Sequence, residues 1–180
     1  FVYPREEIKL TTNLVGKNFL NNLVGALACA FLLGIKIEDI AGILNNLELL
    51  PHSFEVVKKS SPVIIDDSYN ANLIGVEKGS EFFLQLPLAY RVLFFGGILE
   101  LGVETKDLYK NLIKNFQQFD KIVLTFKDFA EVFTEMLGSK VEIYSHQSLY
   151  DFIKDYPLEE LGIIVFGRIP QELLEQIRNL

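Results

Sequence analysis

The polar loop Asp66–Asn72 holds the densest set of chemically useful side chains in the sequence. Its seven positions read Asp-Asp-Ser-Tyr-Asn-Ala-Asn and supply two carboxylates, a hydroxyl, a phenol and two amides. One or two such residues are enough to cap a helix or to close a turn. The surplus of hydrogen-bonding groups directly after the apolar run Val63–Ile65 favours a ligand site. A turn that only caps a helix remains the alternative.

A second candidate loop covers residues 96–102, which read GGILELG and follow the apolar run Val92–Phe95. The glycine pair lets the backbone approach a ligand or another chain segment closely. Glu100 lies between apolar neighbours, and the sequence leaves open whether its carboxylate is buried and paired or solvated. The chain has neither a dinucleotide-type glycine fingerprint nor a glycine-rich loop with a lysine that could cradle phosphates. The loop alone is therefore a weak sign of nucleotide binding.

The remaining reactive residue types are sparse. His52 and His146 are the only histidines, and neither has a nearby nucleophile or acidic partner in the sequence, so we expect surface or packing roles for both. Cys29 lies in an apolar helical stretch and is expected to pack as a small hydrophobic residue rather than to react. One cysteine and two distant histidines exclude a disulfide framework and a Cys/His zinc cluster. We predict no metal site in this chain.

Composition excludes several classes of protein. The 180 residues are 49% hydrophobic, which argues against disorder, and 17 basic against 24 acidic residues give a formal net charge of −7, the wrong sign for a nucleic-acid binder. The most apolar stretch, residues 23–35, is shorter than the roughly 20 residues of a spanning helix. No signal peptide pattern is visible, so we expect a cytoplasmic protein without membrane insertion. Because the sequence lacks an initiator Met, we also expect that it begins inside a longer chain.

Alternating elements are predicted to position the two loops. The expected strands are Val63–Ile65, Val92–Phe95, Ile122–Thr125, Val141–Tyr144 and Ile163–Phe166. The expected helices between and after them are Ile74–Leu86, Lys106–Phe116, Phe129–Leu137, Gln147–Lys154 and Pro170–Arg178. Strict alternation of this kind predicts an α/β, Rossmann-like domain with a mostly parallel sheet flanked by helices. Ligands bind such sheets at the carboxyl ends of the strands, where both candidate loops lie.

The region before this domain has a different residue pattern, which predicts helices only. Small and apolar residues run almost all round a predicted helix over Asn22–Leu33, which Gly34 ends. Isoleucines at helical spacing predict a second short helix over residues 35–43. We therefore expect a helical remnant of another domain ahead of the α/β domain.

Three segments together resemble one family, the Mur ligases. The residues IIDDSYNAN at 64–72 and GGILELG at 96–102 are similar to two of its motifs, in the same order. Upstream, GKNFLNN at 16–22 resembles the segment of that family that reads GxHNxxN. The resemblance implies that residues 1–53 are the tail of the ATP-binding central domain and that residues 54–180 are the C-terminal Rossmann-like domain.

The resemblance also implies an activity for the full-length protein. Mur ligases use ATP and Mg²⁺ to activate a UDP-muramoyl peptide as an acyl-phosphate, which an amino acid or dipeptide such as D-alanyl-D-alanine then attacks. The new amide bond belongs to a peptidoglycan precursor. In this family the central domain supplies the phosphate-binding loop and the metal ligands. We therefore expect that this chain alone carries no catalytic residue, is inactive by itself, and comes from a monomeric cytoplasmic enzyme.

The resemblance assigns roles to individual residues. Asn22 would face the adenine, as the last asparagine of the upstream segment. Asp67 would contact the ribose. Tyr69, Asn70 and Asn72 would line the nucleotide side of a cleft that closes around ATP and excludes water. Glu100 and Gly102 would lie on the loop that faces the substrate.

Several positions depart from the motifs of the family. The departures are Asn18-Phe19 for His-Asn, Ser53 for an arginine, Leu73 for a proline, Gly97-Ile98 for Asp-Met, Tyr109 for a histidine, and Phe166-Gly167-Arg168 for Lys-Gly-Ser. All of them except Leu73 remove or change a polar or charged group. The alternative is therefore a diverged, non-catalytic homologue that acts as a binding or scaffolding module. A dinucleotide-dependent oxidoreductase shares only the fold class and lacks the glycine fingerprint.

Overall fold

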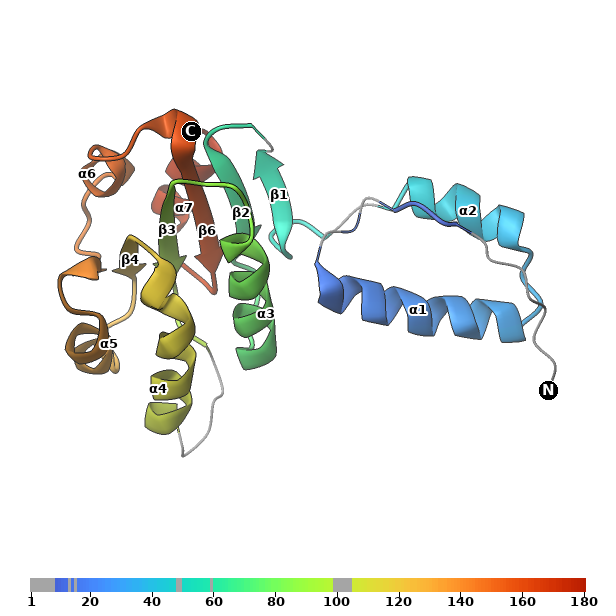
Figure 1. Cartoon of the computed structure of the whole chain (residues 1–180), viewed down its shortest axis with the longest axis horizontal. Coiled ribbons are helices and arrows are strands. Elements are labelled where there is room, and N and C mark those ends of the chain that lie inside the picture. Colours follow the sequence, from blue (N-terminus) through green and yellow to red (C-terminus); the bar gives the residue numbers. More distant parts are fainter. Residues whose placement is uncertain (1–8, 13, 15, 48–49, 59, 99–104) are drawn as a thin grey trace. The chain divides into compact units, whose positions relative to one another are not determined.

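The computed structural model describes residues 9–12, 14, 16–47, 50–58, 60–98 and 105–180. The chain divides into two compact units, residues 1–49 and residues 50–180 (Figure 1). The boundary predicted from the sequence lies after residue 53, close to this division.

The first unit contains the two expected helices, α1 (Lys17–Leu32) and α2 (Ile37–Asn45). Helix α1 begins five residues before the predicted start, because no helix-breaking residue lies between Gly16 and Asn22. Gly34 follows α1 with a φ of 76°, a left-handed conformation that ends helices readily. Ile40 and Leu44 of α2 are buried.

The second unit is built on a six-stranded sheet with the order β1-β2-β6-β3-β4-β5. Its strands are β1 (Glu55–Lys58), β2 (Val63–Asp67), β3 (Tyr90–Phe95), β4 (Lys121–Leu124), β5 (Val141–Ile143) and β6 (Leu161–Phe166). All neighbouring strands pair in parallel except β1 and β2, which are antiparallel. The expected α/β architecture with a mostly parallel sheet is confirmed.

Strand β1 is absent from the strands predicted from the sequence. Its four residues, EVVK, carry only two apolar side chains and give no periodic signal. The strand forms because it adds an antiparallel edge to β2, in a register that sets Glu55 opposite Asp66. This pairing brings two carboxylates side by side on neighbouring strands.

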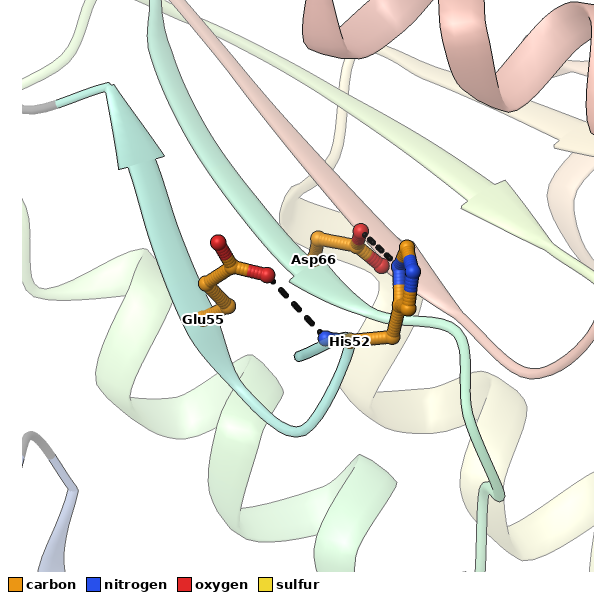
Figure 2. A group of neighbouring side chains, drawn as sticks. All are labelled: His52, Glu55 and Asp66. Carbon is orange, nitrogen blue, oxygen red and sulfur yellow. Dashed lines mark hydrogen bonds and ion pairs between the residues drawn. The ribbon is translucent and has the colours of Figure 1, made fainter. Parts of the chain in front are cut away.

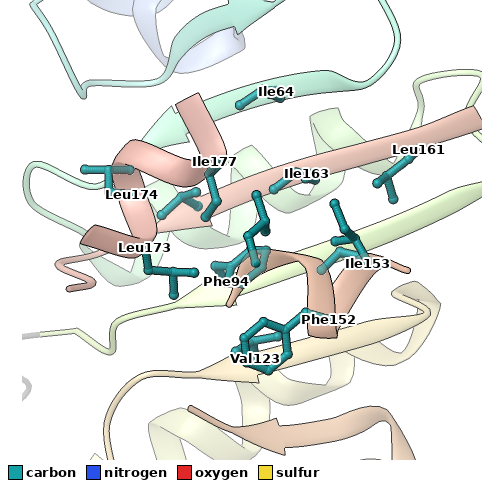
Figure 3. Packing of buried hydrophobic residues seen from close by; sticks show 13 residues of the cluster. Ile64, Phe94, Val123, Phe152, Ile153, Leu161, Ile163, Leu173, Leu174 and Ile177 are labelled. Carbon is teal, nitrogen blue, oxygen red and sulfur yellow. The ribbon is translucent and has the colours of Figure 1, made fainter. Parts of the chain in front are cut away.

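Helices cover both faces of the sheet. They are α3 (Leu73–Leu84), α4 (Thr105–Asn115), α5 (Ala130–Leu137), α6 (Leu149–Ile153) and α7 (Gln171–Arg178). On one face, α6 and α7 pack on alternate strand residues such as Ile64 and Phe94 (Figure 3). On the other face, α4 and α5 cover Phe95, whose ring contacts Tyr109 of α4 and Phe133 of α5. Because successive side chains of a strand point to opposite faces of the sheet, each strand contributes to two separate hydrophobic cores.

Strand β6 is buried along its whole length, between β2 and β3. Its continuous apolar sequence, LGIIVF, is typical of a parallel strand covered on both faces. Across the described residues, no helix is both long and apolar enough to cross a membrane.

Candidate functional site

The carboxyl ends of three central strands lie side by side. Asp67 at the end of β2 is in register with Phe166 of β6, and Phe166 is in register with Phe95 of β3. The polar loop after β2 and the glycine loop after β3 therefore start at the same edge of the sheet, on either side of β6. This is the edge at which open α/β sheets bind ligands.

Backbone contacts fix the start of the glycine loop. The N–H of Gly96 donates to the carbonyl oxygen of Phe166 at 2.7 Å. A Cβ atom at position 96 would lie 2.2 Å from the backbone oxygen of Arg168, so only glycine fits. Of the two possibilities left open for the glycine pair, the structure realises the close approach of another chain segment.

The loop after β6 is held in the same way. Gly167 has a φ of 72°, and its N–H donates to the carbonyl oxygen of Asp67 at 3.1 Å. A Cβ atom at this position would lie 2.3 Å from the carbonyl oxygen of Gly97, which itself has a φ of 81°. Glycines in two loops thus hold the ends of three strands together.

Asp67 lies half-buried at this edge. One of its carboxylate oxygens, Oδ1, accepts a hydrogen bond from the backbone N–H of Phe54 at 2.9 Å. Burial raises the pKa of Asp67 to about 6; the N–H of Phe54 opposes this shift and the nearby charge of Asp66 adds to it. The carboxyl group is therefore a partly desolvated hydrogen-bond acceptor at the end of a central strand, and its charged form is disfavoured by burial.

The other loop residues divide into structural and exposed groups. Asn72 caps α3, because its side-chain oxygen accepts the N–H of Gly75 at 2.8 Å. The side chains of Tyr69 and Asn70 are exposed, while the N–H of Tyr69 donates to the carbonyl oxygen of His52 at 3.0 Å. The loop thus contains the helix cap that the alternative interpretation predicts. Beside this cap, it also presents the exposed polar side chains of Tyr69 and Asn70.

The structure brings only part of the predicted site together. Asp67 is the last residue of β2, and Tyr69, Asn70 and Asn72 lie in the loop that follows it. Asn22 is exposed on α1, in the first unit, and its role toward an adenine stays a prediction. Glu100 and Gly102 lie outside the described residues.

A charged cluster, His52, Glu55, Asp66 and Arg178, borders the polar loop. Figure 2 shows three of its members, with the imidazole Nδ1 of His52 lying 2.8 Å from Oδ2 of the buried Asp66. The backbone N–H of His52 donates to Oε2 of Glu55 at 3.0 Å. The prediction that His52 has no acidic partner was wrong, because Asp66 reaches it from a strand 14 residues away.

Arg178 neutralises the two carboxylates of this cluster. Its guanidinium binds both oxygens of Glu55, at 2.9 and 3.1 Å, and also donates to Asp66. The hydrogen bond from Arg178 lowers the pKa of Glu55. Burial alone would raise the pKa of Asp66, but hydrogen bonds from Ser68, His52 and Arg178 lower it overall. Sequence reasoning missed Arg178, because no spacing relates it to residues more than 100 positions earlier.

The same cluster is a poor metal site. Ligand atoms of His52, Glu55 and Asp66 lie within 4.8 Å of one another, a spacing that could suit a cation. The guanidinium of Arg178 already occupies this place and supplies the positive charge. The group is therefore better described as an ion-pair network.

A cavity of about 330 Å³ lies beside this cluster, at the ends of β2 and β6. It is lined by His52, Ser68, Tyr69, Arg168, Ile169, Gln171 and Leu174. The cavity places polar groups of three chain segments around one space, next to the exposed Tyr69. This edge of the second unit can therefore receive a polar ligand.

Tyr109 replaces the histidine expected from the motif and has a packing role. The residue is buried, and its hydroxyl oxygen accepts the backbone N–H of Ile98 at 3.0 Å. Its ring lies against Phe126 and Phe133, and burial raises the pKa of its phenol. The hydroxyl group of Tyr109 thus holds the backbone of the glycine loop at Ile98.

Comparison with known proteins gives a consistent result. A family model described as "Mur ligase, glutamate ligase domain" matches residues 54–158. The UDP-N-acetylmuramoyl-tripeptide–D-alanyl-D-alanine ligase of Escherichia coli is 29% identical over 104 residues, which are 57% of this chain and 23% of that protein. The enzyme of the same name from Borreliella burgdorferi is 28% identical over 170 residues, 92% of this chain and 36% of that protein.

Solved structures share the fold. The MurF ligase of Thermotoga maritima in complex with ADP superposes with a TM-score of 0.74 at 20% identity, over 92% of this chain and 39% of that one. A MurF structure from Acinetobacter baumannii gives a TM-score of 0.77 at 21% identity, over 95% of this chain and 40% of that one. The chain thus spans well under half the length of these relatives. Because the family model covers more than half of the chain, this chain belongs to the Mur ligase family, with the glutamate ligase domain at residues 54–158.

Proposed function

We propose that this chain is the C-terminal part of an ATP-dependent ligase that joins a UDP-muramoyl peptide to an amino acid or dipeptide. Two relatives named as D-alanyl-D-alanine-adding ligases support D-alanyl-D-alanine as the incoming substrate. A cytoplasmic, monomeric enzyme of peptidoglycan synthesis that binds no nucleic acid fits this proposal and the net charge of −7.

Asp67 is the observation that carries the proposal. Its half-buried carboxyl group lies at the carboxyl end of β2, in a loop that also exposes Tyr69 and Asn70. A carboxylate at such a position is a strong acceptor for the two hydroxyl groups of a ribose. Tyr69 and Asn70 then line the nucleotide beside it and keep water from the closed site. The helix cap Asn72 holds the loop in place from the α3 side.

In this proposal, the residues that bind ATP and Mg²⁺ lie partly in this chain and partly in the rest of the enzyme. ATP, when bound, supplies the phosphoryl group that activates the carboxyl group of the substrate. Asp67, Tyr69 and Asn70 would hold the nucleoside end of ATP. Among the described residues, the acidic group with metal-like spacing is neutralised by Arg178, so we expect Mg²⁺ to be held outside this chain.

A non-catalytic homologue is the second candidate, and the departure at Tyr109 favours it. A histidine of the family motif is replaced there by a buried phenol whose oxygen is engaged by Ile98. That side chain serves packing and offers no basic nitrogen to a substrate.

Titration of the ¹⁵N-labelled 180-residue chain with ADP tests the nucleotide assignment. We expect the amide signals of residues 67–72 to shift with a dissociation constant of about 1 mM or weaker, since only part of the site is present. Signals of β5, at the far edge of the sheet, should not move. Asp67→Ala should abolish the shifts, whereas the exposed variant Asp151→Asn should keep them. Shifts confined to other elements, or a nanomolar affinity, would contradict the assignment.

A further inference from the structure

The first residues of the second unit adopt an unusual backbone. His52 and Phe54 have φ values of 63° and 52°, a left-handed conformation that bulky residues rarely adopt. Such conformations persist only where the surrounding contacts hold them. The segment His52–Glu55 therefore needs external support, and the contacts that provide it are visible.

Several contacts that support this segment come from the polar loop and the charged cluster, in addition to the packing of the Phe54 ring against Phe82. The carbonyl oxygen of His52 accepts the N–H of Tyr69 at 3.0 Å, and the N–H of Phe54 donates to Asp67 at 2.9 Å. The ring of His52 contacts Asp66, which also accepts the N–H of Ser68 at 3.0 Å. The left-handed segment and the candidate nucleotide loop thus form one hydrogen-bonded body.

Arg178 sits at the centre of this body. Glu55 and Asp66 are register partners on antiparallel strands, so their like charges would repel without a cation between them. The guanidinium of Arg178 binds both carboxylates and reaches them from α7, the last helix of the chain. Bidentate geometry with Glu55 fixes the direction of the side chain as well as its charge.

We propose that Arg178 is a positioning residue for the nucleotide loop, which acts by holding Glu55 and Asp66 and through them the segment His52–Glu55 and Asp67. The inference rests on the proposed nucleotide role of Asp67. Arg178 itself touches no ligand in this account. Its guanidinium sets where the Asp67 carboxyl and the Tyr69 backbone lie.

Hydrogen exchange of the 180-residue chain without nucleotide tests the positioning directly. In Arg178→Met, protection of the Ser68 and Tyr69 amides should fall at least tenfold more than protection of the Tyr144 amide, which bonds to Leu124 on the far side of the sheet. Arg178→Lys, which keeps the charge, should restore part of this protection. Lys78→Met, which breaks an exposed ion pair of 2.8 Å with Glu81, should leave all three amides unchanged.

The possible results separate positioning from a general loss of stability. An equal fall of protection at Ser68, Tyr69 and Tyr144, or no fall at the first two, would overturn the proposal. If Arg178→Met does not fold, Glu55→Gln serves instead, since it removes one charge of the pair and keeps an oxygen for the N–H of His52. The same selective loss at Ser68 and Tyr69, of smaller size, is then expected.

Kinetics of the full-length ligase give a second, independent readout. Arg178→Met should raise KM for ATP at least fivefold while kcat changes less than twofold, and Arg178→Lys should recover part of the loss. A fall of kcat at unchanged KM would contradict a role in nucleotide positioning. If the native protein shows no ATP-dependent activity, the proposed function fails, whereas hydrogen exchange still decides the structural role of Arg178.

Discussion

Replacing Asp67 with asparagine is expected to raise the free energy of unfolding at pH 7.5 and, at the same time, to weaken nucleotide binding. The pKa of Asp67 is raised from 3.8 to about 6, so at pH 7.5 the folded protein keeps a charge where burial disfavours it. Asparagine is neutral and still offers an oxygen to the N–H of Phe54. From the size of this shift, the gain should be about 1–3 kcal/mol.

The sign of this effect sets its pH dependence. A carboxyl group with a raised pKa stabilises the fold fully below its unfolded value of 3.8, and this contribution disappears as the pH rises through about 6. The difference in unfolding free energy between Asp67→Asn and the native chain should therefore be largest above pH 6 and should vanish near pH 3.8. Urea denaturation over this pH range measures it.

Asp151→Asn is a control with the opposite sign. Hydrogen bonds from Ser148 lower the pKa of Asp151, whose carboxylate closes a capping box at the start of α6. Its removal should therefore reduce stability at neutral pH, and the reduction should fade as the pH falls through the acidic range. For Asp67→Asn, a loss of stability at pH 7.5 would contradict the expectation, because it would show that burial does not disfavour the charged form of Asp67.

The functional cost of Asp67→Asn follows from the proposed contact with ribose. A neutral amide accepts hydrogen bonds more weakly than a carboxylate, so KM for ATP in the full-length ligase should rise about tenfold. A variant that is more stable but binds nucleotide less well is typical of a residue kept for function. Unchanged KM would remove Asp67 from the nucleotide site.

Gly96→Ala is expected to lower the free energy of unfolding of the second unit by about 3 kcal/mol. The new Cβ atom would meet the backbone oxygen of Arg168 at 2.2 Å and the backbone nitrogen at 2.8 Å. Both neighbours are main-chain atoms, which cannot rotate away as a side chain would. The loops after β3 and β6 must therefore separate, and the hydrogen bond from Gly96 to Phe166 is lost.

Gly42→Ala is the matched control for this substitution. Gly42 lies inside α2, where a Cβ atom would meet nothing within 4 Å, and alanine favours helix there by about 0.5–1 kcal/mol. Urea unfolding followed by far-UV circular dichroism, which reports on the helices of both units, measures both variants. A Gly96→Ala chain as stable as the native one would mean that the three strand ends do not need this close backbone contact.

Much of the fold could be predicted because its elements carry strong local signals. Continuous apolar runs identify β3 and β6, and helical spacing identifies α4 and α7, all within two residues of their observed ends. Strand β1 could not be found in this way. Its formation depends on pairing with β2 rather than on its own four residues.

The candidate site was predictable only in its local part. The polar loop is visible in the sequence because its residues are contiguous, and the cap at Asn72 follows from its residue type. The partners of Asp66 come from other elements, so neither His52 nor Arg178 could be assigned to it from spacing. Long-range ion pairs leave no periodic trace in one sequence.

An assay of ATP turnover by the full-length ligase tests the central claim most directly. Phosphate release is measured with a UDP-muramoyl tripeptide and a panel of amino acids and dipeptides that includes D-alanyl-D-alanine. We predict release that depends on one amine, that falls at least tenfold in Asp67→Ala, and that persists in Asp151→Asn. Phosphate release without any dependence on an amine, or full turnover by Asp67→Ala, would contradict the account.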